Sequence, residues 1–176
     1  GGGSNAIGFF APYIDTASPR LIGVEAGGRG TRTGEHAARM NGLGRSGIVQ
    51  GYKSLFLLDE DGQVEATHSL SAGLDYPGIG PQLAHLGSAG RVEFARASDL
   101  EALEAVKTFA RNEGVIFALE SAHGGAHALK VAAELPPEAV VVINMSGRGD
   151  KDLFIAAKEI RGESWNEFLR TEADRI

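Results

Sequence analysis

The stretch Ala139-Val-Val-Val-Ile-Asn-Met-Ser-Gly-Arg-Gly-Asp-Lys-Asp152 decides the fold class. Its apolar, mostly β-branched residues indicate a fully buried strand of a parallel sheet over 139–143. Ser146–Gly149 reads as a tight loop, and Asp150 can cap a helix over 151–160. A buried strand that passes through a short loop directly into a helix is the repeating unit of an α/β fold.

The same alternation of strand and helix recurs in the first third of the chain. Ser98, followed three residues later by Glu101, forms a capping box that starts a helix over 99–111. We therefore expect a mostly parallel sheet flanked by helices. The other predicted elements are helices over 6–14, 119–135 (interrupted at Gly124-Gly125) and 163–170, strands over 21–25 and 91–94, a glycine-rich loop over 27–34, and a hairpin whose strands 52–58 and 63–67 flank the turn Asp59–Gly62.

Charge and residue composition exclude several classes of function. The chain has 176 residues, 23 of them acidic and 17 basic, for a net charge of −6. An excess of acid argues against nucleic-acid binding, and zero cysteine excludes disulfides and thiolate chemistry. No apolar run long enough to span a membrane and no secretion leader is visible, so we expect a cytoplasmic protein. The chain opens on Gly1 without a methionine or a leading strand, so we expect it to begin in mid-fold.

The segment Gly1-Gly-Gly-Ser-Asn5 passes directly into an apolar helix. Glycines allow backbone N–H groups to approach an anion closely, and a helix start adds about half a positive charge. We interpret the loop as a phosphate cradle, with the Ser4 hydroxyl and the Asn5 amide as further donors; a flexible linker is the alternative. The segment also fits the dinucleotide fingerprint G-x-G-x-x-A, with Glu25 about twenty residues further on.

Two other segments carry candidate chemistry. Ser146 follows a predicted strand, so it faces the ligand crevice of an open α/β sheet as a neutral donor or acceptor. Glu120 starts a helix that also carries His123 and His127 one turn apart. A zinc site is disfavoured, because the zinc motif H-E-x-x-H needs glutamate where Gly124 stands. We expect packed histidines, and close packing at the two glycines.

Five motifs occur in one order: Gly1-Gly-Gly-Ser-Asn-Ala6, Leu21-Ile-Gly-Val-Glu-Ala26, His68-Ser-Leu-Ser-Ala-Gly-Leu-Asp-Tyr-Pro77, Leu119-Glu-Ser-Ala-His123 and Asn144–Asp152. Together they resemble the carboxyl-terminal part of the tryptophan synthase β subunit. The resemblance runs from Gly1 to about Ile160, and residues 161–176 carry no motif. Residues 1–176 would then be the carboxyl-terminal part of a two-domain enzyme.

This resemblance implies the fold of a type II pyridoxal-phosphate enzyme, incomplete in this chain. The family condenses L-serine with indole to L-tryptophan and water, and it uses pyridoxal 5'-phosphate together with a monovalent cation such as Na⁺ or K⁺. It works as a complex with the tryptophan synthase α subunit and as a β homodimer. The implied activity is therefore that of a lyase in the biosynthesis of an aromatic amino acid.

The resemblance also assigns roles to residues of the matched motifs. Ser146 would hydrogen-bond the pyridine nitrogen, and a neutral partner there suits β-replacement. Glu120 would lie beside the cofactor ring, assist elimination and orient indole. Asp75 would form a gating ion pair with an arginine of the missing half. The remaining implied contacts are Gly1, Gly2, Gly3, Ser4 and Asn5 on the phosphate, Gly147 beside Ser146, Gly73 and Leu74 in the pocket, and the backbone carbonyls of Gly1, Tyr76 and Gly78 on the cation.

The lysine that binds the cofactor covalently in this family belongs to an amino-terminal half that is absent here. None of the five lysines lies in a matching motif, and we expect Lys53 and Lys151 to be solvated or ion-paired. Activity would therefore need the amino-terminal half. Two alternatives stay open: an NAD(P)-dependent oxidoreductase fragment, based on the glycine loop and Glu25, and an inactive structural fragment that needs a partner chain.

Overall fold

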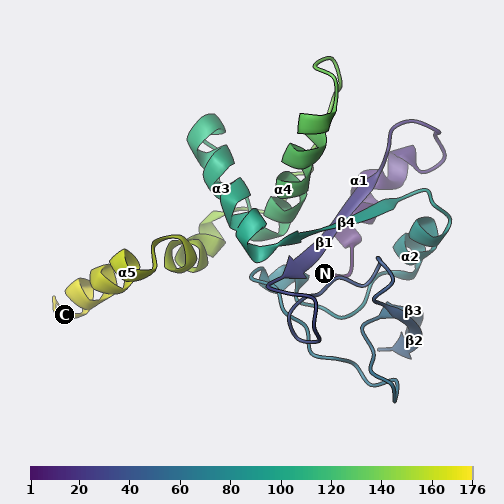
Figure 1. Ribbon diagram of the computed structural model, residues 1–176, viewed down its shortest axis with the longest axis horizontal. Coiled ribbons are helices and arrows are strands. Elements are labelled where there is room, and N and C mark those ends of the chain that lie inside the picture. Colours follow the sequence, from purple (N-terminus) through teal and green to yellow (C-terminus); the bar gives the residue numbers. More distant parts are fainter. Residues whose placement is uncertain (176) are drawn as a thin grey trace.

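The computed structural model describes residues 1–175. At its centre, strands β1 (Ile22–Gly28) and β4 (Glu93–Ser98) form a parallel pair with helices on both faces (Figure 1). Ile22 lies opposite Glu93, and Ala26 lies opposite Ala97. The predicted α/β class with a parallel sheet is therefore confirmed, and both strands continue beyond their predicted ends.

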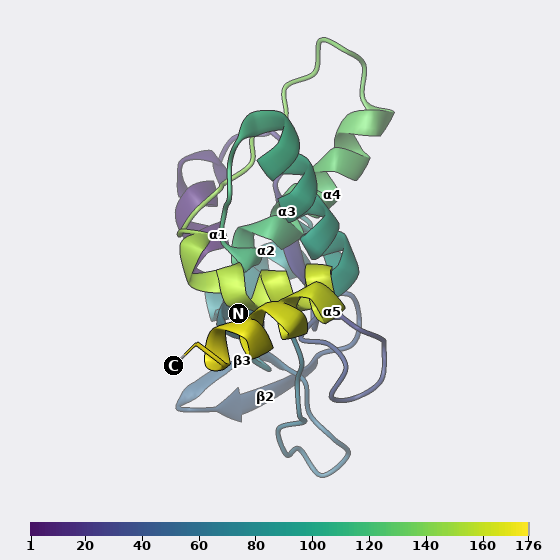
Figure 2. The same cartoon turned by 90° about the vertical axis from the view of Figure 1, so that its left-hand side faces the viewer.

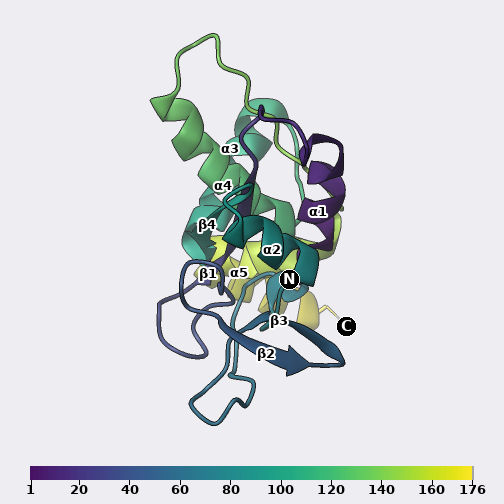
Figure 3. The ribbon, with the colours of Figure 1, turned by 90° about the vertical axis from the view of Figure 1, so that its right-hand side faces the viewer.

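Helices α3 (Asp99–Glu113) and α4 (Leu119–Glu134) cover one face of this pair, where Ala97 packs against Ala105 and Ala126. Helix α1 (Ser4–Phe10), extended by a 3-10 turn over Ala11–Tyr13, and helix α2 (Pro81–Ser88) cover the other face. There Phe10 and Leu83 pack beside Phe94. Figure 3 shows α1 and α4 on either side of the strands.

The capping box of α3 is confirmed. Ser98 Oγ accepts from the Glu101 N–H at 3.3 Å, and Glu101 Oε2 accepts from the Ser98 N–H at 2.7 Å. The predicted interruption of α4 is wrong, because the helix runs through Gly124 and Gly125. Packing explains only Gly125, where an added Cβ would lie 3.2 Å from Phe117; at Gly124 it would meet nothing within 4 Å.

The predicted hairpin is partly wrong. Strand β3 (Tyr52–Phe56) pairs with β2 (Arg45–Val49), and the pair turns at Gln50-Gly51, both with positive φ. Two left-handed residues in succession give the turn whose twist suits a hairpin. Asp59–Gly62 is a turn as predicted, and Asp59 Oδ1 stabilises it by accepting from the Gln63 N–H at 2.8 Å. The predicted strand over 63–67 does not form, because this segment makes only one isolated β-bridge, from Val64 to Leu58.

Short 3-10 turns lie at Ala72–Leu74 and Asp150–Asp152. The second of them leads directly into α5 (Leu153–Ala173), which bends at Gly162. The bend separates the two helices predicted over 151–160 and 163–170. Asp150 makes no side-chain cap, contrary to prediction. Figure 2 shows α5 crossing one end of α3 and α4, where Ile155 and Ile160 pack on their apolar residues.

The strand predicted over 139–143 is the largest error. The segment is extended chain without strand pairing, and Val140 and Val142 are 86% and 71% exposed. A strand satisfies its backbone N–H and C=O groups through a neighbouring strand, and no strand within residues 1–175 lies beside this segment. Separately, none of the helices that the structure describes is long and apolar enough to cross a membrane.

Candidate functional site

A cavity of about 860 Å³ lies between α1, β1, α4 and the segment 139–146. Its volume is typical of sites for small ligands and cofactors. Most of the predicted cofactor residues line it, although they come from distant parts of the sequence: Gly1, Gly2, Gly3, Ser4, Asn5, Gly73, Glu120 and Ser146. Asp75, Tyr76, Gly78 and Gly147 do not line it.

The loop at one end of the cavity leads into α1. Gly3 precedes the helix with a φ of 87°, a left-handed conformation that favours glycine. The first N–H groups of a helix have no partner within the helix, so they are available to an anion. Ser4 and Asn5 are exposed, and Asn5 Oδ1 accepts from Asn144 Nδ2 at 3.1 Å. The loop thus lies beside the segment that leads to Ser146.

Glu120, in the first turn of α4, is held by its neighbours. A Cβ on Gly73 would collide with the Glu120 side chain, so a larger residue at 73 would displace the carboxylate from its present position. Lys151 Nζ donates to both carboxylate oxygens, at 3.1 and 2.9 Å. Partial burial raises the pKa of Glu120, but the hydrogen bonds from Lys151 and the backbone outweigh burial and lower the pKa overall. The carboxylate is therefore ionised at neutral pH and can accept hydrogen bonds from a ligand.

Ser146 lies beside α4, where Ser121 Oγ donates to its backbone oxygen at 2.9 Å and lies 3.2 Å from its hydroxyl. A hydroxyl has one hydrogen to donate. If Ser121 donates to the carbonyl, the contact between the two hydroxyls can only be donated by Ser146, so the Ser146 hydroxyl would have to rotate away from Ser121 to donate to a ligand. Gly147 follows with a φ of 73°, and an added Cβ would lie 3.1 Å from Ala118 Cβ. This left-handed residue turns the chain away from the cavity.

A buried ion pair lies at the base of the same cavity. Arg39 Nε is 3.3 Å from Glu25 Oε1, and their side chains are 2% and 5% exposed. Glu25 Oε2 accepts from the backbone N–H groups of Arg39 and Met40 at 3.1 and 2.9 Å. Glu25 Oε1 has no hydrogen-bond partner in the part of the chain that the structure describes, but it is buried and paired with the Arg39 charge. A carboxylate that is buried and ion-paired in this way is poorly placed to bind a ribose, which weakens the dinucleotide interpretation.

Two of the backbone oxygens that were predicted to bind the cation accept hydrogen bonds from Arg39 instead. Its guanidinium donates to the backbone oxygens of Gly1 and Tyr76, the latter at 3.0 Å. Gly78, the third predicted ligand, packs against the Phe56 ring. Two of the three oxygens thus accept from a fixed positive charge, so the residues present do not fit a monovalent metal ion.

The remaining candidates have local roles in this structure. Asp75 Oδ1 accepts from Thr67 Oγ1 at 2.6 Å, and its predicted arginine partner is not among residues 1–175. His123 is fully buried, with Nδ1 2.8 Å from the Leu119 oxygen, as expected of a packed histidine. No group of three or more metal-ligating side chains occurs in the described part of the chain.

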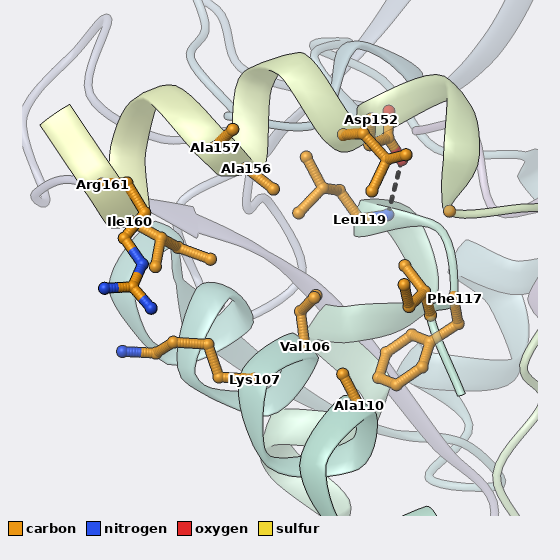
Figure 4. Close-up of a pocket in the computed structure, with 13 residues that line it drawn as sticks. Val106, Lys107, Ala110, Phe117, Leu119, Asp152, Ala156, Ala157, Ile160 and Arg161 are labelled. Atoms are coloured by element: carbon orange, nitrogen blue, oxygen red, sulfur yellow. Dashed lines mark hydrogen bonds between the residues drawn. The ribbon is translucent and has the colours of Figure 1, made fainter. Parts of the chain in front are cut away.

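A smaller cavity of about 240 Å³ lies between α3 and α5 (Figure 4). Val106, Phe117 and Ile160 give it apolar walls, and Asp152 Oδ2 accepts from the Leu119 N–H at 2.9 Å at its edge. Asp152 therefore satisfies a free N–H at the start of α4. This contact fixes the end of the helix that carries Glu120.

Arg39, Lys151 and Ser121 shape the site but were not identified in the sequence as parts of it. Of the two states expected for Lys151, solvated or ion-paired, the structure shows the second, and it identifies the partners as Glu120 and Asp152, which the sequence did not predict. Arg39 stands in no motif that predicts a ligand, and only the fold brings it to the oxygens of Gly1 and Tyr76.

Comparisons with known proteins agree with the motifs. No protein-family model matches the chain. Over 177 aligned residues, which take in the whole chain, it is 56% identical to the tryptophan synthase beta chain of Helicobacter hepaticus, and it spans 42% of that protein's length. The resemblance to the tryptophan synthase β chain that the motifs predicted is therefore confirmed along the full length of this chain, as a part of a longer relative.

Proposed function

We propose that this chain provides one side of the active site of a pyridoxal-phosphate enzyme that condenses L-serine with indole to L-tryptophan and water. The observation that carries the proposal is the meeting of three distant segments at one cavity: Gly1–Asn5, Glu120 and Ser146. The 56% identity to a tryptophan synthase beta chain supports the same reaction.

The residues present fit the cofactor. A phosphate needs several N–H donors and no nearby carboxylate, and the start of α1 meets this need, since no acid stands in its first turn. Gly73 leaves space for Glu120, which a side chain there would fill. Ser146 offers a neutral hydroxyl at the position where the resemblance requires a partner for the ring nitrogen.

When bound, the cofactor supplies an electron sink for the loss of the serine hydroxyl and the addition of indole. The backbone N–H groups of the Gly1–Asn5 loop bind its phosphate. Ser146 donates to the ring nitrogen and, as a neutral donor, leaves that nitrogen unprotonated. Glu120, as a carboxylate beside Lys151, would accept the hydrogen bond of the indole N–H and would carry a proton between indole, which loses one, and the departing serine hydroxyl, which takes one up.

This chain lacks the lysine that would bind the cofactor covalently. Burial opposes the charge of Lys151, but its hydrogen bonds to Asp152 and Glu120 together outweigh burial and raise its pKa, so it stays protonated and is no nucleophile. We propose that an amino-terminal segment supplies that lysine, the loop that binds the serine carboxylate, the partner of Asp75 and the strand beside 139–143. The α subunit, a second β chain and a cytoplasmic location belong to the same proposal.

Binding of pyridoxine 5'-phosphate tests the proposal on this chain alone, because this analogue has no aldehyde and cannot react with a lysine. Ser146→Ala removes one hydrogen bond, so we expect about three- to tenfold weaker binding, with the fold intact. Ser88→Ala, on α2 and outside the cavity, is the matched control and leaves the affinity unchanged. Phosphorus NMR or fluorescence measures both.

Equal affinity of the Ser146→Ala variant and the unsubstituted chain would show that Ser146 has no role at the ring nitrogen. Binding of NADH without binding of pyridoxine 5'-phosphate would instead favour the oxidoreductase alternative. If neither ligand binds even when the amino-terminal segment is supplied, the chain is better interpreted as an inactive structural fragment that needs a partner chain.

A further inference from the structure

Arg39 holds together three separate segments around one buried charge. Its Nη1 donates to the Ala37 oxygen at 2.6 Å and to the Tyr76 oxygen at 3.0 Å, and its Nη2 donates to the Gly1 oxygen. The side chain is 2% exposed, and Glu25 is its counter-ion. A buried positive charge surrounded by backbone oxygens and balanced by one carboxylate is the environment that a protein builds for a monovalent cation.

A metal ion and this guanidinium exclude each other. Both would bind the backbone oxygens of Gly1 and Tyr76, and a second positive charge a few ångströms away inside the protein would be strongly repelled. Glu25 neutralises one positive charge and already accepts from two backbone N–H groups. Arginine stays charged over the whole accessible pH range, even though burial lowers its pKa here. The Arg39 guanidinium therefore occupies this group of backbone oxygens as a charged group at every accessible pH.

We propose that Arg39 takes the place of the monovalent metal ion in this chain, so that the protein needs no Na⁺ or K⁺ to order its cofactor site. The identification of the site as a cation position rests on the proposed function; the occupancy by Arg39 does not. The side chain links Gly1 of the phosphate loop to Tyr76, three residues beyond Gly73, which contacts Glu120. Arg39 is thus a positioning residue for both ends of the cofactor.

The test measures unfolding temperature and ¹³³Cs NMR line width in chlorides of Na⁺, K⁺, Cs⁺ and choline at equal ionic strength. The chain is used with an acetylated amino terminus, so that the Gly1 amino group cannot supply a charge. For the unsubstituted chain we expect equal stability in all four salts and no saturable Cs⁺ broadening. Stabilisation by a metal ion over choline, or broadening that K⁺ reverses, would overturn the proposal.

Arg39→Ala opens the oxygens and leaves Glu25 as counter-charge. We expect this variant to bind Cs⁺ at least about tenfold more tightly than the unsubstituted chain, and to be stabilised by K⁺ or Cs⁺ over choline. Arg39→Lys, which keeps a positive charge, is the matched control and stays insensitive to the metal ion. An Arg39→Ala variant that folds equally well in every salt would overturn the proposal.

Should Arg39→Ala not fold in any salt, Arg39→Ser keeps Glu25 as counter-charge, adds a hydroxyl oxygen beside the site and gives the same Cs⁺ readout. Saturable Cs⁺ binding is expected there, and its absence would show that these oxygens form no cation site. Neither readout needs the cofactor. Loss of pyridoxine 5'-phosphate binding together with the expected salt behaviour would therefore contradict the proposed function alone.

Discussion

The segments Ile22–Gly28 and Ala139–Ile143 were both expected to contribute strands, but only the first does so in this structure. Ile22–Gly28 is paired with β4, and Val24 packs against the alanines of β4, α3 and α4. Ala139–Ile143 is more apolar, yet it has no neighbouring strand among the residues described, and Val140 is 86% exposed. Apolar, β-branched composition shows that a segment needs burial, but only a neighbouring strand makes it a strand.

The largest loss of stability is expected when the buried ion pair between Glu25 and Arg39 is broken. Glu25→Gln leaves Arg39 buried without a counter-ion, so we expect a loss of about 3–5 kcal/mol in the free energy of unfolding. Glu93→Gln, which breaks the exposed pair with Arg20 at the start of β4, is the control and costs at most about 1 kcal/mol. Urea denaturation measures both, and similar losses would show that the buried pair is not structurally important.

Truncation of apolar side chains tests the comparison of the two segments directly. Leu21, just before β1, is 5% exposed, so Leu21→Ala should cost about 2–5 kcal/mol. Val142 is 71% exposed, so Val142→Ala should change the stability by less than about 0.5 kcal/mol in this chain. If Val142→Ala costs as much as Leu21→Ala, the segment 139–143 is buried in solution and our description of it is wrong.

A smaller, pH-dependent effect is expected from His123. Burial lowers its pKa below the ordinary value, against the weaker opposing effect of the Leu119 carbonyl. The unfolded chain then binds the proton more readily, so stability is full above about pH 6.5 and falls as the pH drops, by about 1.4 kcal/mol per unit of pKa shift. His123→Gln should remove this decline below pH 6.5, and an unchanged pH profile would contradict the assignment.

The parts of the fold that local sequence determines were predictable. The capping box at Ser98 and Glu101 needs only residues three apart, and α3 begins where expected. The β2 strand carries no alternation of apolar residues, and it exists because β3 lies beside it, so it was missed. Motifs identified Glu120 and Ser146 as site residues, and the structure brings them to one cavity, but their roles there stay predictions.

What sequence could not predict depends on long-range geometry. Arg39 reaches Tyr76 across 37 positions of sequence, and no local pattern marks such a contact. The same holds for Asp152, which satisfies the start of α4 from the far side of the segment 139–149. In both cases a charged side chain binds backbone groups that are far away in sequence.

Tryptophan formation by a chimera tests the central claim most directly. In it, this chain replaces the matching part of the Helicobacter hepaticus protein, which supplies the amino-terminal segment. With L-serine, indole and pyridoxal 5'-phosphate we expect tryptophan, and we expect Glu120→Gln to lower kcat by about a hundredfold or more while cofactor affinity changes little. A folded, cofactor-loaded chimera that forms no tryptophan, or one in which Glu120→Gln lowers affinity as much as kcat, would contradict the account.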